Sequence, residues 1–384
     1  MNLKRLCLVA TLFALGGCST IDTVKEWTGL AVLGPEPMKL EEFQPSAGFT
    51  ERWHASVGES GANPLQPALT QDAVYGVSAK GELTRLDRAT GKVIWRVASD
   101  VNTTAGVGSG DGLLVFGGEK GEVLAYDEDG KQRWSSKVSS EVLGVPQVAD
   151  GIVVVRSGDA HIAGLSASTG KRLWVYERST PALVVRSHAS VVIYRGMVFA
   201  GFAAGKLVAL KLSDGSDIWE TNVSQPRGST ELERISDITS NPVVNDNQIC
   251  AIAFQGNLGC YDAGQGNPLW TRNISGDKGL SIAGKNLYAA DTDGSVIALD
   301  KVSGSTIWKN DQLLRRDTSL PYEQGNLVVV GDLEGFLHGL SQQDGRMAAR
   351  IKLDGSAILA APQGMDGGLL VQTRGGEVYS LTIR

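Results

Sequence analysis

One cysteine near the start of this 384-residue chain stands where its thiol could be modified after export. Lys4 and Arg5 are followed by an apolar run over residues 6–15 and then by Gly16-Gly17-Cys18. Basic residues before a short apolar run are typical of a secretory signal peptide. A bilayer span needs about 20 helical residues, so this run predicts export rather than a permanent membrane span.

Leu15-Gly16-Gly17-Cys18 resembles the bacterial lipobox, in which small residues precede a cysteine that receives a diacylglycerol. The resemblance implies cleavage after residue 17 and a lipid on Cys18. An ordinary signal peptide followed by an incidental cysteine is the alternative. Lipoproteins kept at the inner membrane usually carry aspartate after the cysteine, whereas Ser19 follows it in this chain, so we expect an anchor on the periplasmic face of the outer membrane.

The charge balance limits the class of partner. The chain holds 36 lysines and arginines against 42 aspartates and glutamates, and losing Lys4 and Arg5 leaves 34 basic residues and a net charge of −8. Such a balance does not suit a polyanion, so we do not expect nucleic acid as a partner.

The remaining reactive side chains are few. Cys250 and Cys260 flank a predicted turn at residues 255–257, so they either pair across a hairpin or remain buried free thiols. The histidines are residues 54, 161, 188 and 338. They are scattered and show no Ser/His/Asp or Cys/His grouping, so we expect neither a catalytic residue nor a metal site nor a cofactor.

These residues must be positioned by a repeated element. One sequence phrase recurs with a period of roughly 40 residues, the size of one propeller blade. It consists of Gly-x-Leu/Val, an apolar residue, often an Asp, then Thr/Ser-Gly and finally Trp. A seventh copy has Ala349 in the tryptophan position. Counting a tryptophan near the N-terminus, the tryptophans in this position are Trp53, Trp95, Trp134, Trp174, Trp219, Trp270 and Trp308.

Each copy predicts a four-stranded antiparallel blade, because short β-rich runs are separated by glycine-containing turns. In Asp300-Lys301-Val302-Ser303-Gly304, the carboxylate can accept hydrogen bonds from turn amides while Gly304 takes the left-handed conformation. Asp127-Glu128-Asp129-Gly130 and Asp291-Thr292-Asp293-Gly294 faintly resemble calcium loops but lack the ligand spacing, so we expect turns there too. The tryptophans are predicted to pack each blade against the next.

The ends of the chain predict how the ring closes. The last copy stops at Arg384 without an outer strand, and residues 50–57 form an unpaired outer-strand phrase around Trp53. We therefore expect an all-β, eight-bladed propeller closed by an N-terminal strand in the last blade. The predicted organisation is a signal peptide over 1–17, a lipidated cysteine and tether over 18–48, and a propeller over 49–384.

The phrase Asp-x-x-Thr/Ser-Gly-x-x-x-Trp resembles the repeat of quinoprotein alcohol dehydrogenases and covers almost all of the mature chain. Those enzymes hold pyrroloquinoline quinone and calcium and usually carry a vicinal disulfide. This chain has neither a Cys-Cys pair nor a haem-attachment motif. The resemblance therefore implies the fold and not the activity.

The lipobox, tether and bare ring together resemble the BamB family of lipoproteins in the outer-membrane β-barrel assembly (BAM) machinery. Residues 228–237 look like the family's loop into the fifth blade, and residues 183–186 like its exposed stretch into the fourth. The resemblance implies a non-enzymatic scaffold that binds the POTRA domains of BamA and aids the folding and insertion of outer-membrane proteins, with unfolded outer-membrane proteins as further partners. It assigns partner binding to Leu183, Val185, Arg186 and Asp237.

Several alternatives stay open. Thr239 stands where the family pattern has a second acid, which weakens the expected electrostatic contact. Leu183 and Val185 could instead belong to a buried strand, and Arg186 and Asp237 could form an ion pair within the chain. A catalytic site in the central channel and a propeller that binds sugar or peptidoglycan are the rival functions.

Overall fold

The computed structural model describes residues 36–384. The predicted signal peptide, Cys18 and the tether up to residue 35 lie outside the described residues. Within residues 36–384 the regular structure consists of 32 strands and one short 3-10 turn, η1 (Ala203–Gly205). No helix among the described residues is long and apolar enough to cross a membrane.

The first four blades in chain order each contain four consecutive strands, which run from the innermost to the outermost. They are β2 (Ala68–Leu69), β3 (Ala73–Val77), β4 (Glu82–Asp87) and β5 (Val93–Ala98); β6 (Gly108–Gly110), β7 (Leu113–Gly117), β8 (Glu122–Asp127) and β9 (Gln132–Lys137); β10 (Gln147–Ala149), β11 (Ile152–Arg156), β12 (Ile162–Ser166) and β13 (Arg172–Tyr176); and β14 (Val192–Tyr194), β15 (Met197–Gly201), β16 (Lys206–Lys211) and β17 (Asp217–Asn222).

The next three blades follow the same order, and the eighth takes its outermost strand from the N-terminal side. They are β18 (Val243–Asn245), β19 (Gln248–Ile252), β20 (Leu258–Asp262) and β21 (Pro268–Arg272); β22 (Leu280–Ala283), β23 (Asn286–Ala290), β24 (Val296–Asp300) and β25 (Thr306–Asn310); β26 (Tyr322–Gln324), β27 (Leu327–Gly331), β28 (Phe336–Ser341) and β29 (Met347–Lys352); and β30 (Gln363–Met365), β31 (Gly368–Gln372), β32 (Glu377–Ile383) and β1 (Phe49–Ser56).

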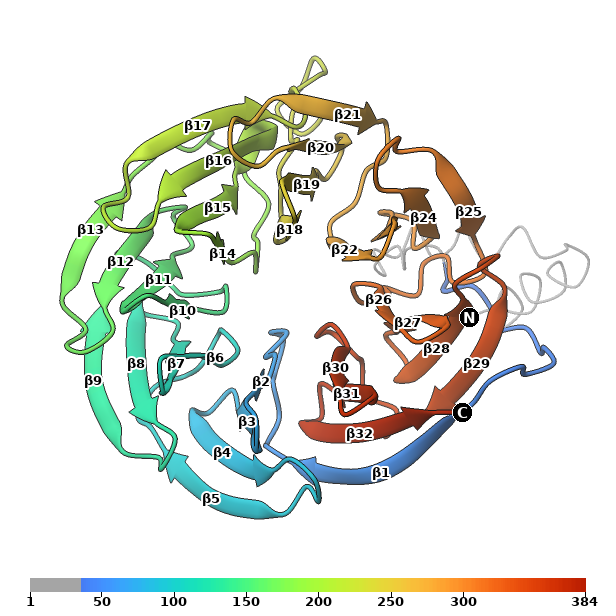
Figure 1. The fold of residues 1–384 in the computed structure, drawn as a ribbon, viewed down its shortest axis with the longest axis horizontal. Helices are drawn as coiled ribbons and strands as arrows, with labels where there is room; N and C mark the ends of the chain where they lie inside the picture. Colours follow the sequence, from blue (N-terminus) through green and yellow to red (C-terminus); the bar gives the residue numbers. More distant parts are fainter. Residues whose placement is uncertain (1–35) are drawn as a thin grey trace, which may run out of the picture. The chain divides into compact units, whose positions relative to one another are not determined.

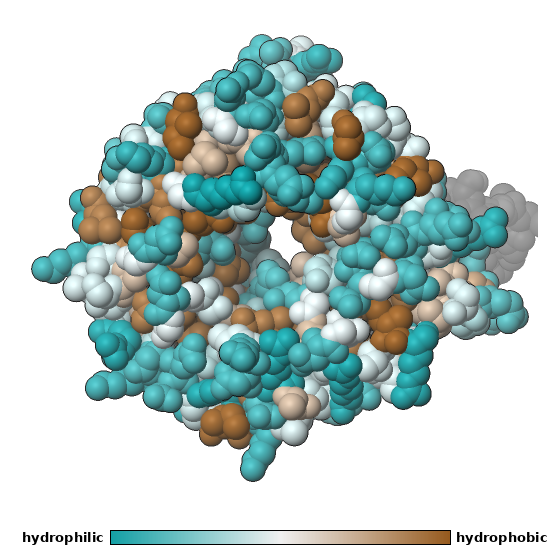
Figure 2. Space-filling model, in the orientation of Figure 1, coloured by the Kyte–Doolittle hydropathy of each residue, from teal (hydrophilic) through white to brown (hydrophobic). Residues whose placement is uncertain are grey.

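The eight sheets stand in a ring with their short inner strands around the centre (Figure 1). β1 pairs antiparallel with β32, from Phe49 opposite Ile383 to Ser56 opposite Glu377. The predicted eight-bladed propeller, closed by an N-terminal strand in the last blade, is confirmed. The space-filling view shows an opening at the centre of the ring and apolar residues scattered among hydrophilic ones on the face in view (Figure 2).

The core lies between neighbouring blades rather than in one central mass. Val115 and Val123 of the second blade pack with Val153 and Val155 of the third, and all four are fully buried. Because the middle strands of a blade are covered on both faces, their sequences are continuous apolar runs such as Val-Val-Val at 153–155. The outer pair of strands in every blade carries a register shift, which adds local twist.

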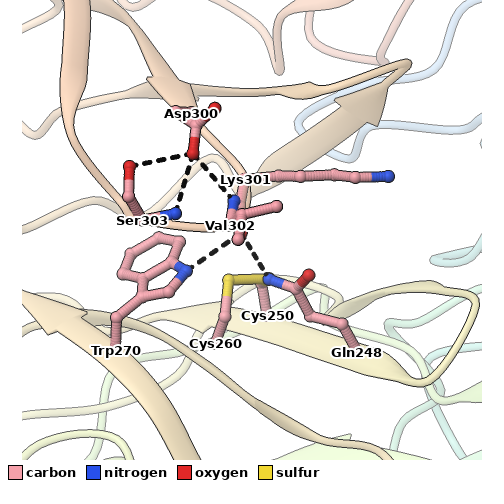
Figure 3. Close-up of a disulfide and its surroundings, with 8 residues drawn as sticks. All are labelled: Gln248, Cys250, Cys260, Trp270, Asp300, Lys301, Val302 and Ser303. Carbon is pink, nitrogen blue, oxygen red and sulfur yellow. Dashed lines mark hydrogen bonds between the residues drawn. A yellow bond between two sulfur atoms is a disulfide. The ribbon is translucent and has the colours of Figure 1, made fainter.

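The seam between the fifth and sixth blades shows how the repeat works (Figure 3). Asp300 accepts hydrogen bonds from the main-chain N–H groups of Val302 and Ser303, at 3.1 and 2.7 Å, and Gly304 has φ +67°, as predicted for this turn. The indole N–H of Trp270 donates to the carbonyl of Lys301 in the same turn at 2.9 Å. A Cβ on Gly304 would lie 2.5 Å from the Trp270 ring, so the glycine is also needed for this close contact.

Figure 3 also shows the disulfide between Cys250 and Cys260. The two cysteines are opposite each other on β19 and β20, with their Cα atoms 4.0 Å apart. The alternative of two buried free thiols is therefore wrong. Gln248, next to the disulfide, donates a side-chain hydrogen bond to the carbonyl of Lys301 at 2.8 Å, so this carbonyl receives two donors from the fifth blade.

Residues 38–48, which the sequence assigns to the tether, are held against the seventh blade. The N–H of Met38 donates to the Leu314 carbonyl at 3.0 Å, and Arg316 donates to the Met38 carbonyl at 2.9 Å. Arg350 donates to the carbonyl of Glu41 at 2.9 Å. The compact unit that contains the ring accordingly begins at Met38.

Both arginines belong to a buried polar cluster. Asp332, with no exposed surface, accepts hydrogen bonds from Arg316 at 2.8 Å and from Nε2 of His338 at 2.9 Å. Nδ1 of His338 accepts a hydrogen bond from Arg350 at 3.2 Å, which leaves the imidazole neutral. Burial, with Arg350 and Arg316 nearby, lowers the pKa of His338.

Candidate docking surface

Two connections between blades are longer than the others. Residues 177–191 lead into β14 of the fourth blade and residues 223–242 lead into β18 of the fifth, whereas residues 99–107 and 138–146 suffice for the second and third blades. Extra length on a rigid scaffold is where binding residues usually lie. The same two connections carry the residues that the sequence predicts to bind a partner.

The first connection forms no strand, so the alternative that Leu183 and Val185 belong to a buried strand is wrong. Leu183 and Val184 are 47% and 44% exposed, and Val185 next to them is half-buried. Apolar side chains exposed side by side on an irregular loop lose contact with water only when a partner covers them. Arg186 is exposed and its guanidinium contacts the Glu141 carboxylate at 2.9 Å, so its partner within the chain is Glu141 and not Asp237.

Asp237 lies beneath the surface rather than on it, with 4% of its area exposed. One carboxylate oxygen accepts the main-chain N–H of Val185 at 2.8 Å, and the other accepts that of Ala204 at 3.0 Å. The Ser187 hydroxyl donates to the carbonyl of Thr239, two residues after Asp237, at 2.8 Å. Asp237 therefore supports the 183–186 loop from below through these hydrogen bonds. Its contact with a partner stays a prediction.

The second connection carries a small capped turn. The Glu233 carboxylate accepts the main-chain N–H groups of Ser229 and Thr230, at 2.8 and 3.1 Å, and the N–H of Glu233 donates to the Thr230 hydroxyl at 3.2 Å. This arrangement is related to the capping box at the start of helices. Leu232 stands at its tip, 67% exposed. Leu232 is not among the residues predicted from the sequence, although the Thr-x-x-Glu pattern at 230–233 is a usable signal for this turn.

A cavity of about 320 Å³ opens under the 183–186 loop. Its wall includes Glu141, Arg156, Val184, Val185 and Asp237. Arg156 is 9% exposed, and burial lowers its pKa to about 10 although the Asp237 carboxylate acts in the opposite direction. Sequence reasoning missed Arg156, because an arginine at the end of the apolar run at 152–155 carries no motif.

The seven tryptophans of the repeat lie at the seams between blades. Each indole N–H donates to a main-chain carbonyl in the turn of the next blade. The donors and acceptors are Trp53 and Arg88, Trp95 and Glu128, Trp134 and Ala167, Trp174 and Leu212, Trp219 and Ala263, Trp270 and Lys301, and Trp308 and Gln342.

The position of Ala349 explains the missing tryptophan. Ala349 faces the eighth blade, where β32 and β1 are not joined by a turn, so no turn carbonyl is available to an indole there. Instead the N–H groups of Ser46 and Ala47 donate to the carbonyl of Ala348 at 3.0 and 3.1 Å. The N-terminal segment occupies the seam that a tryptophan bridges elsewhere.

The structure brings one histidine into a Ser/His/Asp group, which the sequence spacing did not predict. Nδ1 of His161 lies 3.2 Å from both the Ser139 hydroxyl and the Asp159 carboxylate. A catalytic triad uses the two different ring nitrogens for the nucleophile and the acid. In this group both oxygens meet the same nitrogen, so it is not arranged as a triad.

The two turns that resemble calcium loops use their acids for the backbone. Asp127 accepts the N–H groups of Asp129 and Lys131, and Asp291 accepts those of Asp293 and Ser295. Among residues 36–384, no group of three or more acids, histidines or cysteines could hold a metal ion.

Comparisons with known proteins place this chain in a family. The family model described as outer membrane protein assembly factor BamB matches residues 44–97 and 79–310. The outer membrane protein assembly factor BamB of Nitrosomonas eutropha is 40% identical and the match covers 99% of this chain and 95% of that protein. The protein of the same name from Escherichia coli K12 is 31% identical over the full length of both chains.

Solved structures agree with this family. The crystal structure of BamB from Moraxella catarrhalis superposes with a TM-score of 0.80 at 26% identity, covering 87% of this chain and 99% of that one. The quinohemoprotein alcohol dehydrogenase of Comamonas testosteroni reaches a TM-score of 0.73 at 14% identity, covering 87% of this chain and 76% of that enzyme. The second likeness concerns the fold alone.

Proposed function

Because this chain belongs to the BamB family of outer membrane protein assembly factors, we propose that it acts in the BAM complex as a non-enzymatic scaffold that binds the POTRA domains of BamA. The docking surface comprises Leu183, Val184, Val185 and Arg186, supported from below by Asp237. The observation that carries the proposal is the exposed apolar pair Leu183 and Val184, held on an ordered loop beside an arginine.

The energetics favour a small set of anchors. Hot spots in protein interfaces are enriched in arginine and lie in desolvated centres, where truncation costs about 2 kcal/mol or more, roughly a thirtyfold loss of affinity. The solvent-accessible ion pair between Arg186 and Glu141 contributes only about 0–1 kcal/mol to folding. Arg186 can therefore be removed with little effect on stability, and its loss tests binding alone.

The test is recovery of BamA with Arg186→Ala, scored beside a melting curve. We expect recovery to fall by at least tenfold while the melting temperature changes by no more than a degree or two. Arg172→Ala, which removes an exposed arginine from the outermost strand of the third blade, is the matched control and should bind as the wild type. Unchanged recovery from a folded Leu183→Asp, Arg186→Ala double variant would refute this surface.

Asp237→Ala should behave differently from Arg186→Ala. The substitution removes the acceptors of two main-chain N–H groups, including that of Val185. An unsatisfied buried donor costs about 1–3 kcal/mol, so stability and binding should decline together.

We also propose that Cys18 carries a lipid that anchors the chain on the periplasmic side of the outer membrane. The lipobox supports this, as does the assembly of outer-membrane proteins named for the relatives. Cys18→Ala should leave a soluble or uncleaved protein with an intact ring, measured by membrane fractionation and mass spectrometry. A variant that still partitions to the outer membrane would show that the anchor lies elsewhere.

A further inference from the structure

Arg156 is a buried cation that forms no ion pair with any residue in the described part of the chain. It ends β11, and its Nη1 atom is covered yet forms no hydrogen bond with residues 36–384. Its close neighbour is the ring of Phe202, whose centroid lies 5.1 Å from the guanidinium carbon. The aromatic face attracts the cation but accepts none of its N–H groups in the way that an oxygen does.

The acids that line the same cavity are already engaged. Asp237 accepts the two main-chain N–H groups described above, and Glu141 contacts Arg186. A buried guanidinium that lacks an acceptor is costly, because its lost hydration is not replaced. The fold thus keeps a covered N–H donor that no described residue satisfies, which indicates a ligand that supplies the acceptor.

The cavity beside Arg156 has room for that ligand. A volume of about 320 Å³ corresponds to roughly ten water molecules at about 30 Å³ each, so a side-chain carboxylate fits with space to spare. A carboxylate matches the guanidinium fork in two parallel hydrogen bonds and neutralises its charge. A neutral amide would supply only one acceptor oxygen.

We propose that Arg156 forms a carboxylate-binding subsite that receives an aspartate or glutamate side chain of the docking partner. The inference rests on the proposed function, because the wall of the cavity includes Val184 and Val185 of the docking loop. A protein side chain is favoured over a free carboxylate since the exposed Leu183 and Val184 beside the cavity also need to be covered. A partner that covers them can insert an acid in the same step.

The test measures the affinity of the full chain for the periplasmic POTRA domains of BamA with wild type, Arg156→Met and Arg156→Lys. Methionine fills similar space without charge or donors, and we expect a loss of at least tenfold with an unchanged or higher melting temperature. Lysine keeps the charge but not the fork, so we expect an intermediate loss. Arg172→Met, which changes an exposed arginine of the same blade, should bind as the wild type.

A second measurement separates a bound carboxylate from a structural effect. Each aspartate and glutamate exposed on the POTRA domains is changed to its amide and tested against wild type and Arg156→Met. We expect one amide variant to bind wild type at least tenfold more weakly, yet to bind Arg156→Met as tightly as the unchanged partner does. If Arg156→Met folds poorly, the same comparison is made with Arg156→Lys.

The outcomes distinguish the two proposals. Wild type that fails to bind the POTRA domains overturns the proposed function and the subsite together. Wild-type binding that Arg186→Ala weakens and Arg156→Met leaves unchanged overturns only the subsite, and Arg156 is then a solvated residue in a water-filled cavity. Amide variants that weaken both forms of the chain equally also overturn the subsite.

Discussion

Single residues decide how the chain responds to pH, and the cluster around His338 is the clearest case. Its pKa is lowered mainly by burial, so the folded chain keeps His338 neutral at pH values where the unfolded chain takes up a proton. The unfolded pKa is about 6.5. Stability from this residue is therefore complete above that value and is lost as the pH falls below it.

We expect the unfolding free energy to decrease between pH 7.5 and 5.5, with His338 contributing up to about 1.4 kcal/mol per pH unit. His338→Gln should reduce this slope, because glutamine can still donate to Asp332 and accept from Arg350 but does not titrate. Urea unfolding at several pH values measures it. Burial is the largest single influence on the pKa of Asp332 and raises it, but the hydrogen bonds from His338 and Arg316 outweigh burial, so this pKa is lowered. The stability that Asp332 contributes is therefore lost only near pH 4 and below.

His54 provides a control of opposite sign. The Glu51 carboxylate raises the pKa of His54, so this residue contributes stability that is lost as the pH rises. His54→Gln should therefore leave the decrease between pH 7.5 and 5.5 as large as in wild type or larger. A slope that His338→Gln does not change would mean that other groups, such as the half-buried His188, govern the response.

At the scale of elements, the repeat couples a glycine in one blade to a tryptophan in the blade before it. Both residues could be recognised in the sequence, and the blade count followed from their spacing. Their direct contact could not, because the tryptophan of one copy meets the glycine of the next copy and not its own. The docking loops could be recognised from their resemblance to the family's loops, whereas the burial of Asp237 depends on contacts far apart in the sequence.

A pair of glycines separates this contact from backbone conformation. Gly304 and Gly325 have similar positive φ values of +67° and +65°, but only Gly304 lies against an indole, and a Cβ on Gly325 would meet open space. Gly325→Ala should cost about 1–2 kcal/mol for the left-handed conformation. Gly304→Ala should cost a further 1–3 kcal/mol or so for the overlap with Trp270.

Denaturant unfolding of both alanine variants measures the difference. Trp270→Ala combined with Gly304→Ala provides a consistency check, because the overlap no longer exists without the indole. Equal destabilisation of Gly304→Ala and Gly325→Ala would show that the seam adapts to a methyl group and that the glycine is needed for its backbone alone.

For the whole ring, closure depends on a single strand, β1. Deleting residues 49–57 removes the partner of β32, exposes a sheet edge and leaves the first blade without the indole of Trp53. Burial of a tryptophan alone is worth about 3–5 kcal/mol, so the deletion should destabilise the ring by more than Trp53→Ala does. Thermal unfolding followed by circular dichroism measures both variants.

A chain that begins at Pro37 is the matched control, because it keeps Met38 and Glu41, which bind Arg316 and Arg350. It should melt like the mature protein. A chain that begins at Gly61 and melts at that same temperature would show that β1 contributes nothing to the stability of the ring.

The pairing of β1 with β32 also sets the order in which the protein can mature. A ribosome makes β1 before any other strand of the ring and β32 after all of them. All the chain between the two strands must therefore be made before they can pair. Bringing such distant segments together is a slow step, because the chain loses conformational entropy before the two strands form any contact. Every chain therefore carries an unpaired strand until its last blade is made, and the ring can close only once β32 is free to pair with β1.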